Sequence, residues 1–186
     1  MAKGFVETDT QCRQIVQDAR SGIFSPVYLL MGDEPYYVDM VCDAVLEHCL
    51  DESERDFNQT VCYGADVDAD AVITAARRYP MFAERQLAVV KEAQMMKSLE
   101  ELAVYCQNPL ESTVLVIAMH GASADKRKSL YKTVSKMGVV VDSQTLRDYE
   151  MPKWISMFYR TKGLSIAPDA AALLAEHAGT DLNKIA

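Results

Sequence analysis

Short apolar runs alternate with amphipathic stretches along most of this sequence. Continuous apolar runs occupy positions 27–31, 87–90, 113–119 and 139–141. Runs of this length are typical of strands that are covered on both faces. Residues 57–63 alternate apolar and polar positions instead, which predicts a strand with one wetter face. Strands separated by helical patterns predict an α/β fold with a doubly wound, mainly parallel five-stranded sheet.

The first half of the chain contains recognisable helix ends. A first helix is predicted over residues 8–21, where the apolar positions recur at helical spacing. Asp33 or Glu34 is the expected cap of the next helix, because Pro35 is favoured in a first helical turn. The acidic run 51–54 is expected to form a loop.

Later helices are predicted from their caps and charges. Asp66 or Asp68 is expected to open a helix, and Ser98 with Glu101 fits a capping box for another. Residues 124–137 predict a basic helix with apolar positions on its inner face.

The junction near Pro80 sets two large apolar residues next to each other. A proline ring clashes with the backbone before it, so the helix is predicted to close at about Tyr79. Met81 and Phe82 are then expected at the tip of that helix. Neighbours in sequence do not easily both point into one core, so at least one is a candidate for the surface. The pattern leaves open whether the pair caps this core or inserts into another protein.

After residue 142 the pattern becomes helical only. Trp154 marks one predicted helix, Pro168 opens a second, and Thr180 or Asp181 caps a third. We therefore expect an α/β domain over residues 1–145 and a small all-helical domain over 146–186. Because the last helix has barely completed one turn, we expect the sequence to be a piece of a longer protein.

Composition narrows the classes of function. The five cysteines contain no Cys-x-x-Cys pair, which favours reduced thiols, and no apolar run approaches the length of a membrane span. No secretion signal is visible, so a cytoplasmic location is expected, with no membrane partner. A net charge of −8 argues against nucleic-acid binding by this chain alone.

The first strand-to-helix turn lacks the chemistry of a phosphate site. A phosphate loop needs free backbone amides, a lysine and a hydroxyl, but this turn offers Gly32 and the carboxylates of Asp33 and Glu34. The three histidines lack metal-ligand spacing. We therefore predict a degenerate phosphate-loop position, no cofactor, no metal and no catalytic residue.

The basic stretch at 126–136 has two interpretations. Lys126, Arg127 and Lys128 either form a solvated face or contribute to a DNA path that is shared with partner subunits.

Five motifs in this order resemble one family. They lie at residues 27–34, 80–86, 125–128, 154–155 and 179–182. Together they resemble the delta subunits of bacterial DNA polymerase III clamp loaders. The resemblance implies an AAA+-like domain that has lost nucleotide binding, a helical lid domain and a C-terminal collar domain, which we expect to be missing here. It implies no catalytic activity of the chain itself, within a holoenzyme that is a DNA-directed DNA polymerase, a nucleotidyltransferase.

The resemblance also implies partners and a contact site. Delta subunits open the ring-shaped sliding clamp, the beta subunit, and assemble with delta prime and gamma/tau; DNA is expected only within the assembled loader. Two adjacent apolar residues enter a pocket on the clamp, and by motif position these correspond to Met81 and Phe82. Methionine stands where leucine is frequent in the family, and its flexible side chain suits a pocket.

Three neighbouring residues are candidates for a further clamp contact. We hypothesise that the helix predicted over residues 68–79, with Arg77, Arg78 and Tyr79, fits a clamp whose subunit interface has been distorted and fits the closed ring poorly. Cations near a helix end also suit the helix dipole, which explains the two arginines without any partner. Two other functions remain open: a nucleotide-binding AAA+ or P-loop-like ATPase, and an α/β interaction module of another assembly.

Overall fold

Five parallel strands form the centre of the protein, whose computed structural model describes residues 4–186. The strands are β1 (Val27–Gly32), β2 (Gln59–Tyr63), β3 (Gln86–Lys91), β4 (Thr113–Ala118) and β5 (Val139–Ser143). They lie in the order β2-β3-β4-β1-β5, and each neighbouring pair runs parallel. This arrangement confirms the predicted doubly wound α/β sheet.

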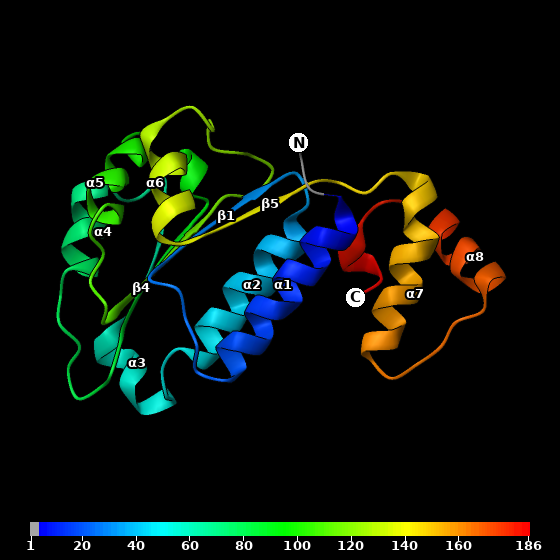
Figure 1. The fold of residues 1–186 in the computed structure, drawn as a ribbon, viewed down its shortest axis with the longest axis horizontal. Helices are drawn as coiled ribbons and strands as arrows, with labels where there is room; N and C mark the ends of the chain where they lie inside the picture. Colours follow the sequence, from blue (N-terminus) through cyan, green and yellow to red (C-terminus); the bar gives the residue numbers. More distant parts are fainter. Residues whose placement is uncertain (1–3) are drawn as a thin grey trace.

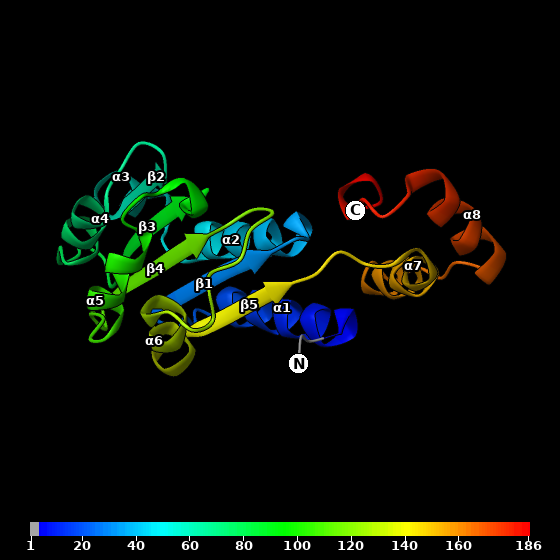
Figure 2. The same ribbon diagram turned by 90° about the horizontal axis from the view of Figure 1, so that it is seen from above.

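Helices cover both faces of the sheet (Figures 1 and 2). On one face lie α1 (Phe5–Arg20) and α2 (Pro35–His48), and on the other lie α4 (Ala69–Ala76), α5 (Ala103–Cys106) and α6 (Ser129–Met137). Alternate residues of each strand enter the two layers: Leu30 and Val116 pack with α1 and α2, whereas Leu29 and Ile117 pack with α4, α5 and α6. The central strands are apolar at nearly every position because both of their faces are buried.

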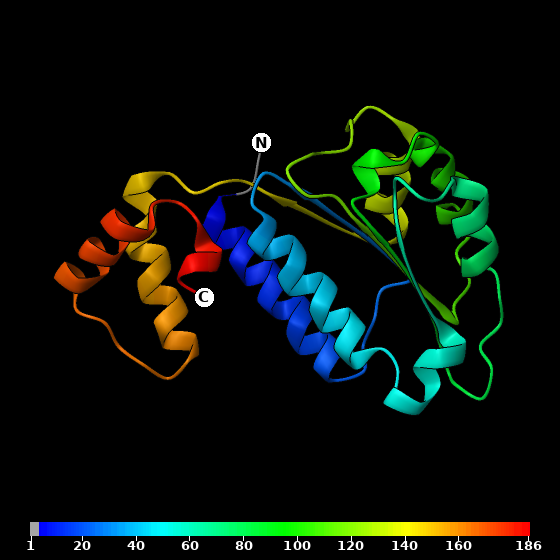
Figure 3. The same ribbon diagram turned by 180° about the vertical axis from the view of Figure 1, so that it is seen from behind.

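An all-helical segment follows β5 and lies beside the ends of α1 and α2 (Figures 2 and 3). It contains α7 (Met151–Thr161), α8 (Pro168–Ala178) and the short 3₁₀ turns Asp148–Glu150 and Leu182–Lys184. Trp154 of α7 is fully buried and donates its indole N–H to the Tyr37 hydroxyl at 2.9 Å. The Tyr37 hydroxyl in turn donates to Asp9 at 3.3 Å, so one buried network joins α1, α2 and α7.

The acidic run at 51–54 is wrongly predicted to be a loop. Residues Glu52–Asn58 form α3, and the Asp51 N–H donates to the Glu54 carboxylate at 3.0 Å. A carboxylate at this place satisfies an amide at the start of a helix, and negative charge suits that end of the helix dipole. The strand predicted from residue 57 therefore begins only at Gln59.

The basic helix begins later than predicted. Lys126, Arg127 and Lys128 lie in the turn before α6, because Asp125 accepts a hydrogen bond from the Arg127 N–H at 2.9 Å. Such Asx turns compete with helix formation.

The predicted capping box at Ser98 is also absent. The Ser98 hydroxyl instead accepts from the Ala69 N–H, at 2.8 Å, at the start of α4. A 3₁₀ turn, Leu99–Leu102, precedes the short α5.

Candidate functional site

The helix α4 ends at Ala76, so the predicted helix tip is wrong. Residues 77–85 form a loop that leads into β3, and Met81 and Phe82 lie inside this loop. The α-helical partner of the Ala76 carbonyl would be the N–H of residue 80, which is a proline without one. Thr113 Oγ1 donates to that carbonyl instead, at 2.8 Å. We call residues 77–85 the plug loop.

The plug loop exposes three large apolar side chains. Phe82 is 96% exposed, Tyr79 is 76% exposed and Met81 is 53% exposed. Phe82 also has a φ of 57°, the left-handed conformation that a side chain with a Cβ disfavours. Met81 and Phe82 therefore do not cap the core: one is half-exposed and the other stands almost wholly in solvent.

A buried asparagine holds the plug loop. Asn58, at the end of α3, accepts from the Met81 N–H through Oδ1 at 2.6 Å and donates from Nδ2 to the Met81 carbonyl at 2.9 Å. Its Nδ2 also donates to the Glu54 carbonyl at 3.0 Å, within α3. Asn58 cannot be recognised from the sequence, because its partner lies 23 positions away and no local pattern joins the two residues.

Arginines flank this anchor. The Arg78 guanidinium donates to the Thr60 hydroxyl at 2.8 Å, which ties the start of the loop to β2. Arg85, at the loop's end, donates to the Gly22 carbonyl at 3.3 Å and lies over the Phe24 ring. Arg77 follows the last helical residue of α4 and is exposed. The structure thus brings together the five residues predicted for clamp contact, in a loop and not on a helix: Arg77, Arg78, Tyr79, Met81 and Phe82.

The turn after β1 lies at the opposite edge of the sheet, and its amides are already occupied. The Gly32 N–H donates to the Ala122 carbonyl at 2.8 Å, and the Asp33 N–H donates to the Ser143 carbonyl at 2.9 Å. Gly32 has a φ of 126°, and a Cβ built there would lie 1.9 Å from the Ser143 carbonyl oxygen. A phosphate would find the amides of Gly32 and Asp33 already bonded.

A carboxylate of the protein occupies the start of α2. Glu34 is buried, and its Oε1 accepts from the Tyr36 N–H at 3.2 Å. Burial raises the pKa of Glu34, and the hydrogen bond from Tyr36 opposes that rise. The helix end that binds phosphate in nucleotide-binding relatives of this architecture is therefore capped by an acidic side chain.

Two of the three predicted DNA-path residues are paired with carboxylates. Lys126 Nζ lies 2.5 Å from Asp142 Oδ2, and Arg127 makes a two-bond contact with Asp125 at 3.0 and 2.9 Å. These contacts raise the pKa of Lys126 and of Arg127. Lys128 is exposed. The DNA path stays a prediction.

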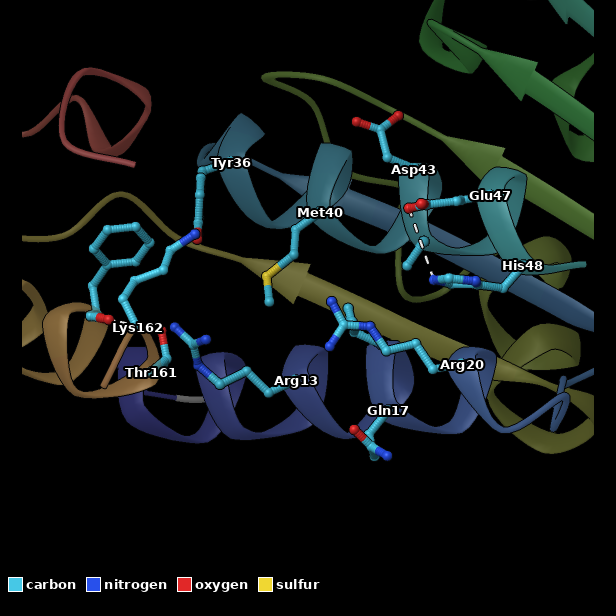
Figure 4. A pocket seen from close by; sticks show the side chains of 13 residues that line it. Arg13, Gln17, Arg20, Tyr36, Met40, Asp43, Glu47, His48, Thr161 and Lys162 are labelled. Atoms are coloured by element: carbon cyan, nitrogen blue, oxygen red, sulfur yellow. Dashed lines mark hydrogen bonds and ion pairs between the residues drawn. The ribbon is translucent and has the colours of Figure 1, made fainter. Parts of the chain in front are cut away.

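A groove lies between α1, α2 and the end of α7 (Figure 4). It has a volume of about 550 Å³, and its α1 wall carries Arg13 and Arg20 while Asp43 and Glu47 extend from α2. Glu47 lies 3.8 Å from His48. Charges of both signs on the outer faces of helices are typical of a solvated groove. Across residues 4–186, no cluster of His, Cys, Asp and Glu is arranged to hold a metal ion.

The sequence profile described as "DNA polymerase III, delta subunit" matches residues 28–144. The chain belongs to this family. It is 25% identical, over 162 residues, to the DNA polymerase III subunit delta of Bacillus subtilis (strain 168), which covers 82% of this chain and 47% of that relative. The chain thus spans about half the length of the curated relative it matches.

Two solved structures superpose on this delta-family chain over most of its length. The Bacillus subtilis DNA clamp loader delta protein (YqeN) superposes with a TM-score of 0.77 at 24% identity, over 94% of this chain and 56% of that one. The Thermotoga maritima RuvB Holliday junction branch migration motor superposes with a TM-score of 0.52 at 15% identity, over 98% of this chain and 59% of that one. Both likenesses establish the AAA+-like α/β fold. In the described part of the chain, no helix has the length and apolar character to span a membrane.

Proposed function

We propose that this delta-family chain is a clamp-loader subunit that binds a sliding clamp through Met81 and Phe82 and takes part in opening the ring. One observation carries the proposal: Phe82 projects almost wholly into solvent from a loop whose backbone is anchored by a buried side chain. An exposed aromatic side chain on an anchored loop suits insertion into a pocket of a partner.

The energetics suit a contact of this kind. Burying each of Met81 and Phe82 in an apolar pocket would contribute roughly 2 to 3 kcal/mol. Contributions of this size are typical of the few residues that dominate an interface. The remaining contacts would then provide complementarity and exclude water.

Ring opening requires more than adhesion. A ligand shifts an equilibrium only by the difference in its affinity for the two states, here the closed and the opened clamp. Arg77 and Tyr79 are exposed beside the two apolar residues, and Arg78 is tied to Thr60 at the start of the loop. We assign this discrimination to these three residues, now as parts of the plug loop.

The rest of the chain would serve assembly. We assign residues 1–145 to an AAA+-like domain without a functional phosphate loop and residues 146–186 to a helical lid. Delta prime and gamma/tau subunits would be its partners, and DNA would be bound only within the assembled loader. The chain itself would have no catalytic activity, which the occupied amides of Gly32 and Asp33 support.

Co-purification with a bacterial sliding clamp tests the proposal. The wild-type chain should retain the clamp, and Met81→Ser combined with Phe82→Ser should abolish retention while the melting temperature stays nearly unchanged. A matched control replaces two exposed leucines of the helical segment, Leu164→Ser with Leu173→Ser, and should retain the clamp. Equal retention by the plug-loop variant, or a large fall in its melting temperature, would refute the proposal.

A further inference from the structure

A single side chain satisfies both backbone groups of Met81. Asn58 Oδ1 accepts the Met81 N–H at 2.6 Å, and Asn58 Nδ2 donates to the Met81 carbonyl at 2.9 Å. Asn58 is fully buried, so water does not replace either bond. The pairing therefore sets the position of the backbone directly before Phe82.

The conformation of Phe82 needs such a restraint. Its backbone is left-handed, with a φ of 57°, which is unfavourable for any residue that carries a Cβ. Strained conformations persist only when the surroundings hold them in place. The Phe82 side chain contributes little restraint because it is 96% exposed.

Only an asparagine meets all three demands at this position. Its amide accepts one hydrogen bond and donates two, to Met81 and to the Glu54 carbonyl at 3.0 Å. An aspartate of the same shape would still accept from the Met81 N–H but would place its second oxygen against two carbonyl oxygens. An alanine would leave three part-buried backbone groups without this partner: the Met81 N–H, the Met81 carbonyl and the Glu54 carbonyl.

We propose that Asn58 is a positioning residue that holds the plug loop in its clamp-binding conformation before the clamp arrives. This inference rests on the proposed function of Met81 and Phe82. A loop that is competent only part of the time binds with an apparent dissociation constant raised by the inverse of the competent fraction. Asn58 keeps that fraction close to one, which removes the ordering cost from the encounter.

The mechanism assigns different kinetic signatures to different residues. Without Asn58 the competent fraction falls, so the association rate constant for the clamp falls. The contacts made by Met81 and Phe82 in the complex are unchanged, so the dissociation rate constant stays nearly the same. Replacing Met81 and Phe82 removes those contacts and raises the dissociation rate constant instead.

Surface-plasmon-resonance kinetics with an immobilised sliding clamp test this difference. Asn58→Asp should lower the association rate constant about tenfold and change the dissociation rate constant less than about twofold, because an unsatisfied buried polar group shifts an equilibrium by roughly that factor. Asn108→Asp makes the same charge change at an exposed position and should leave both constants unchanged. An unchanged association rate for Asn58→Asp would overturn the inference.

Hydrogen exchange separates a local role from general destabilisation. In the wild-type chain the Met81 amide should be protected although its loop is exposed, and Asn58→Asp should remove that protection while the Val89 amide in β3 keeps its own. Fast exchange of Met81 in the wild-type chain, or parallel loss at Val89 in the variant, would overturn the inference even if the variant fold is too weak for kinetics.

The double variant Met81→Ser/Phe82→Ser separates the proposed function of Met81 and Phe82 from the positioning role of Asn58. If it binds the clamp like the wild-type chain, the proposed function fails and the inference falls with it. If it loses the clamp while Asn58→Asp binds with wild-type kinetics, only the role of Asn58 fails.

Discussion

The turn after β1 and the plug loop before β3 lie at opposite ends of the parallel strands, and they differ in how their backbones are hydrogen-bonded. In the turn after β1, the amides of Gly32 and Asp33 bond to the chain itself, and the Glu34 carboxylate caps the next helix. In the plug loop before β3, a buried side chain fixes the backbone of Met81, and Phe82 stands in solvent. The backbone amides of Gly32 and Asp33 are therefore not free to bind a ligand, whereas the plug loop exposes apolar side chains.

The contrast shows where a partner would bind. Ligands of parallel α/β sheets usually occupy the carboxyl edge of the strands. Here the turn after β1 is closed by Ser143, whose single O–H is shared between the Glu34 carbonyl at 2.9 Å and the Met31 carbonyl at 3.2 Å. The plug loop lies at the amino ends of the strands. The exposed apolar side chains that suit a partner are therefore at the opposite end of the strands from the usual ligand site.

The largest expected effect on stability comes from adding a side chain at Gly32, in the turn after β1. Gly32→Ala should lower the free energy of unfolding by more than about 3 kcal/mol, because its Cβ would meet the Ser143 carbonyl at a φ that disfavours any side chain. Chemical denaturation measures the change. Gly22→Ala is the control: its φ of 75° is also positive, but no atom lies within 4 Å of the added Cβ, so about 1 kcal/mol is expected. If Gly32→Ala and Gly22→Ala lowered the free energy of unfolding equally, the close approach of Gly32 to Ser143 would not contribute to the loss.

Removing the hydroxyl of Ser143 should have the next largest effect. Ser143→Ala leaves the buried carbonyls of Met31 and Glu34 without this donor and should cost about 1 to 2 kcal/mol in urea unfolding. Thr145→Val removes a longer, exposed bond to the Asp33 carbonyl and should cost little. A Ser143→Ala variant as stable as the wild-type chain would show that the turn is closed by other contacts.

Relieving the strain at Phe82 should stabilise the chain slightly while clamp binding is lost. Phe82→Gly removes the conformational cost of a left-handed backbone at a residue with a Cβ, about 1 to 2 kcal/mol. Glycine also gives the unfolded chain more conformational entropy, which lowers stability by about 0.5 to 1 kcal/mol. The free energy of unfolding should therefore rise by roughly 0.5 to 1 kcal/mol. Phe57→Gly, at an exposed position within α3, should instead destabilise by a similar amount. If Phe82→Gly were clearly destabilising, the side chain would have a structural role.

The smallest effect concerns pH. Because burial raises the pKa of Glu34 in the folded state, folding binds its proton more firmly, so this group favours folding most at low pH. That contribution is lost as pH rises from the ordinary glutamate range through the raised pKa. The free energy of unfolding of the wild-type chain should therefore fall relative to that of Glu34→Gln between pH 4 and pH 7.5. Parallel stability curves for the two proteins would contradict a raised pKa.

The sequence predicts the sheet well because a strand that is buried on both faces is a continuous run of apolar residues. The apolar run that became β4 is an example, and Pro35 with Glu34 correctly indicated the start of α2. The clash of Pro80 with the residue before it predicts a helix as far as about Tyr79, which places the end of α4 too late. In the structure the last i→i−4 bond of α4 runs from the Arg77 N–H to the Ile73 carbonyl, and the Arg78 N–H bonds to the Ala75 carbonyl instead, so the helix ends before the proline limits it.

The site was only partly visible in the sequence. Met81 and Phe82 stood out by their position after Pro80 and by the family resemblance, but their exposure depends on how the loop leaves α4. Asn58 could not be found, because its bonds to Met81 arise only when α3 and the plug loop meet in the fold. Side-chain bonds between distant loops leave no periodic signal in a sequence.

Photochemical cross-linking at position 82 tests the central claim most directly. The chain with Phe82→p-benzoylphenylalanine is mixed with a bacterial sliding clamp and irradiated, and the cross-linked product is measured. Tyr149→p-benzoylphenylalanine is the control, because Tyr149 is 71% exposed and lies in the 3₁₀ turn Asp148–Glu150 before α7. The account predicts a cross-link to the clamp from position 82 and none from position 149. A complex that forms without cross-linking from position 82, or with equal yield from both positions, would contradict it.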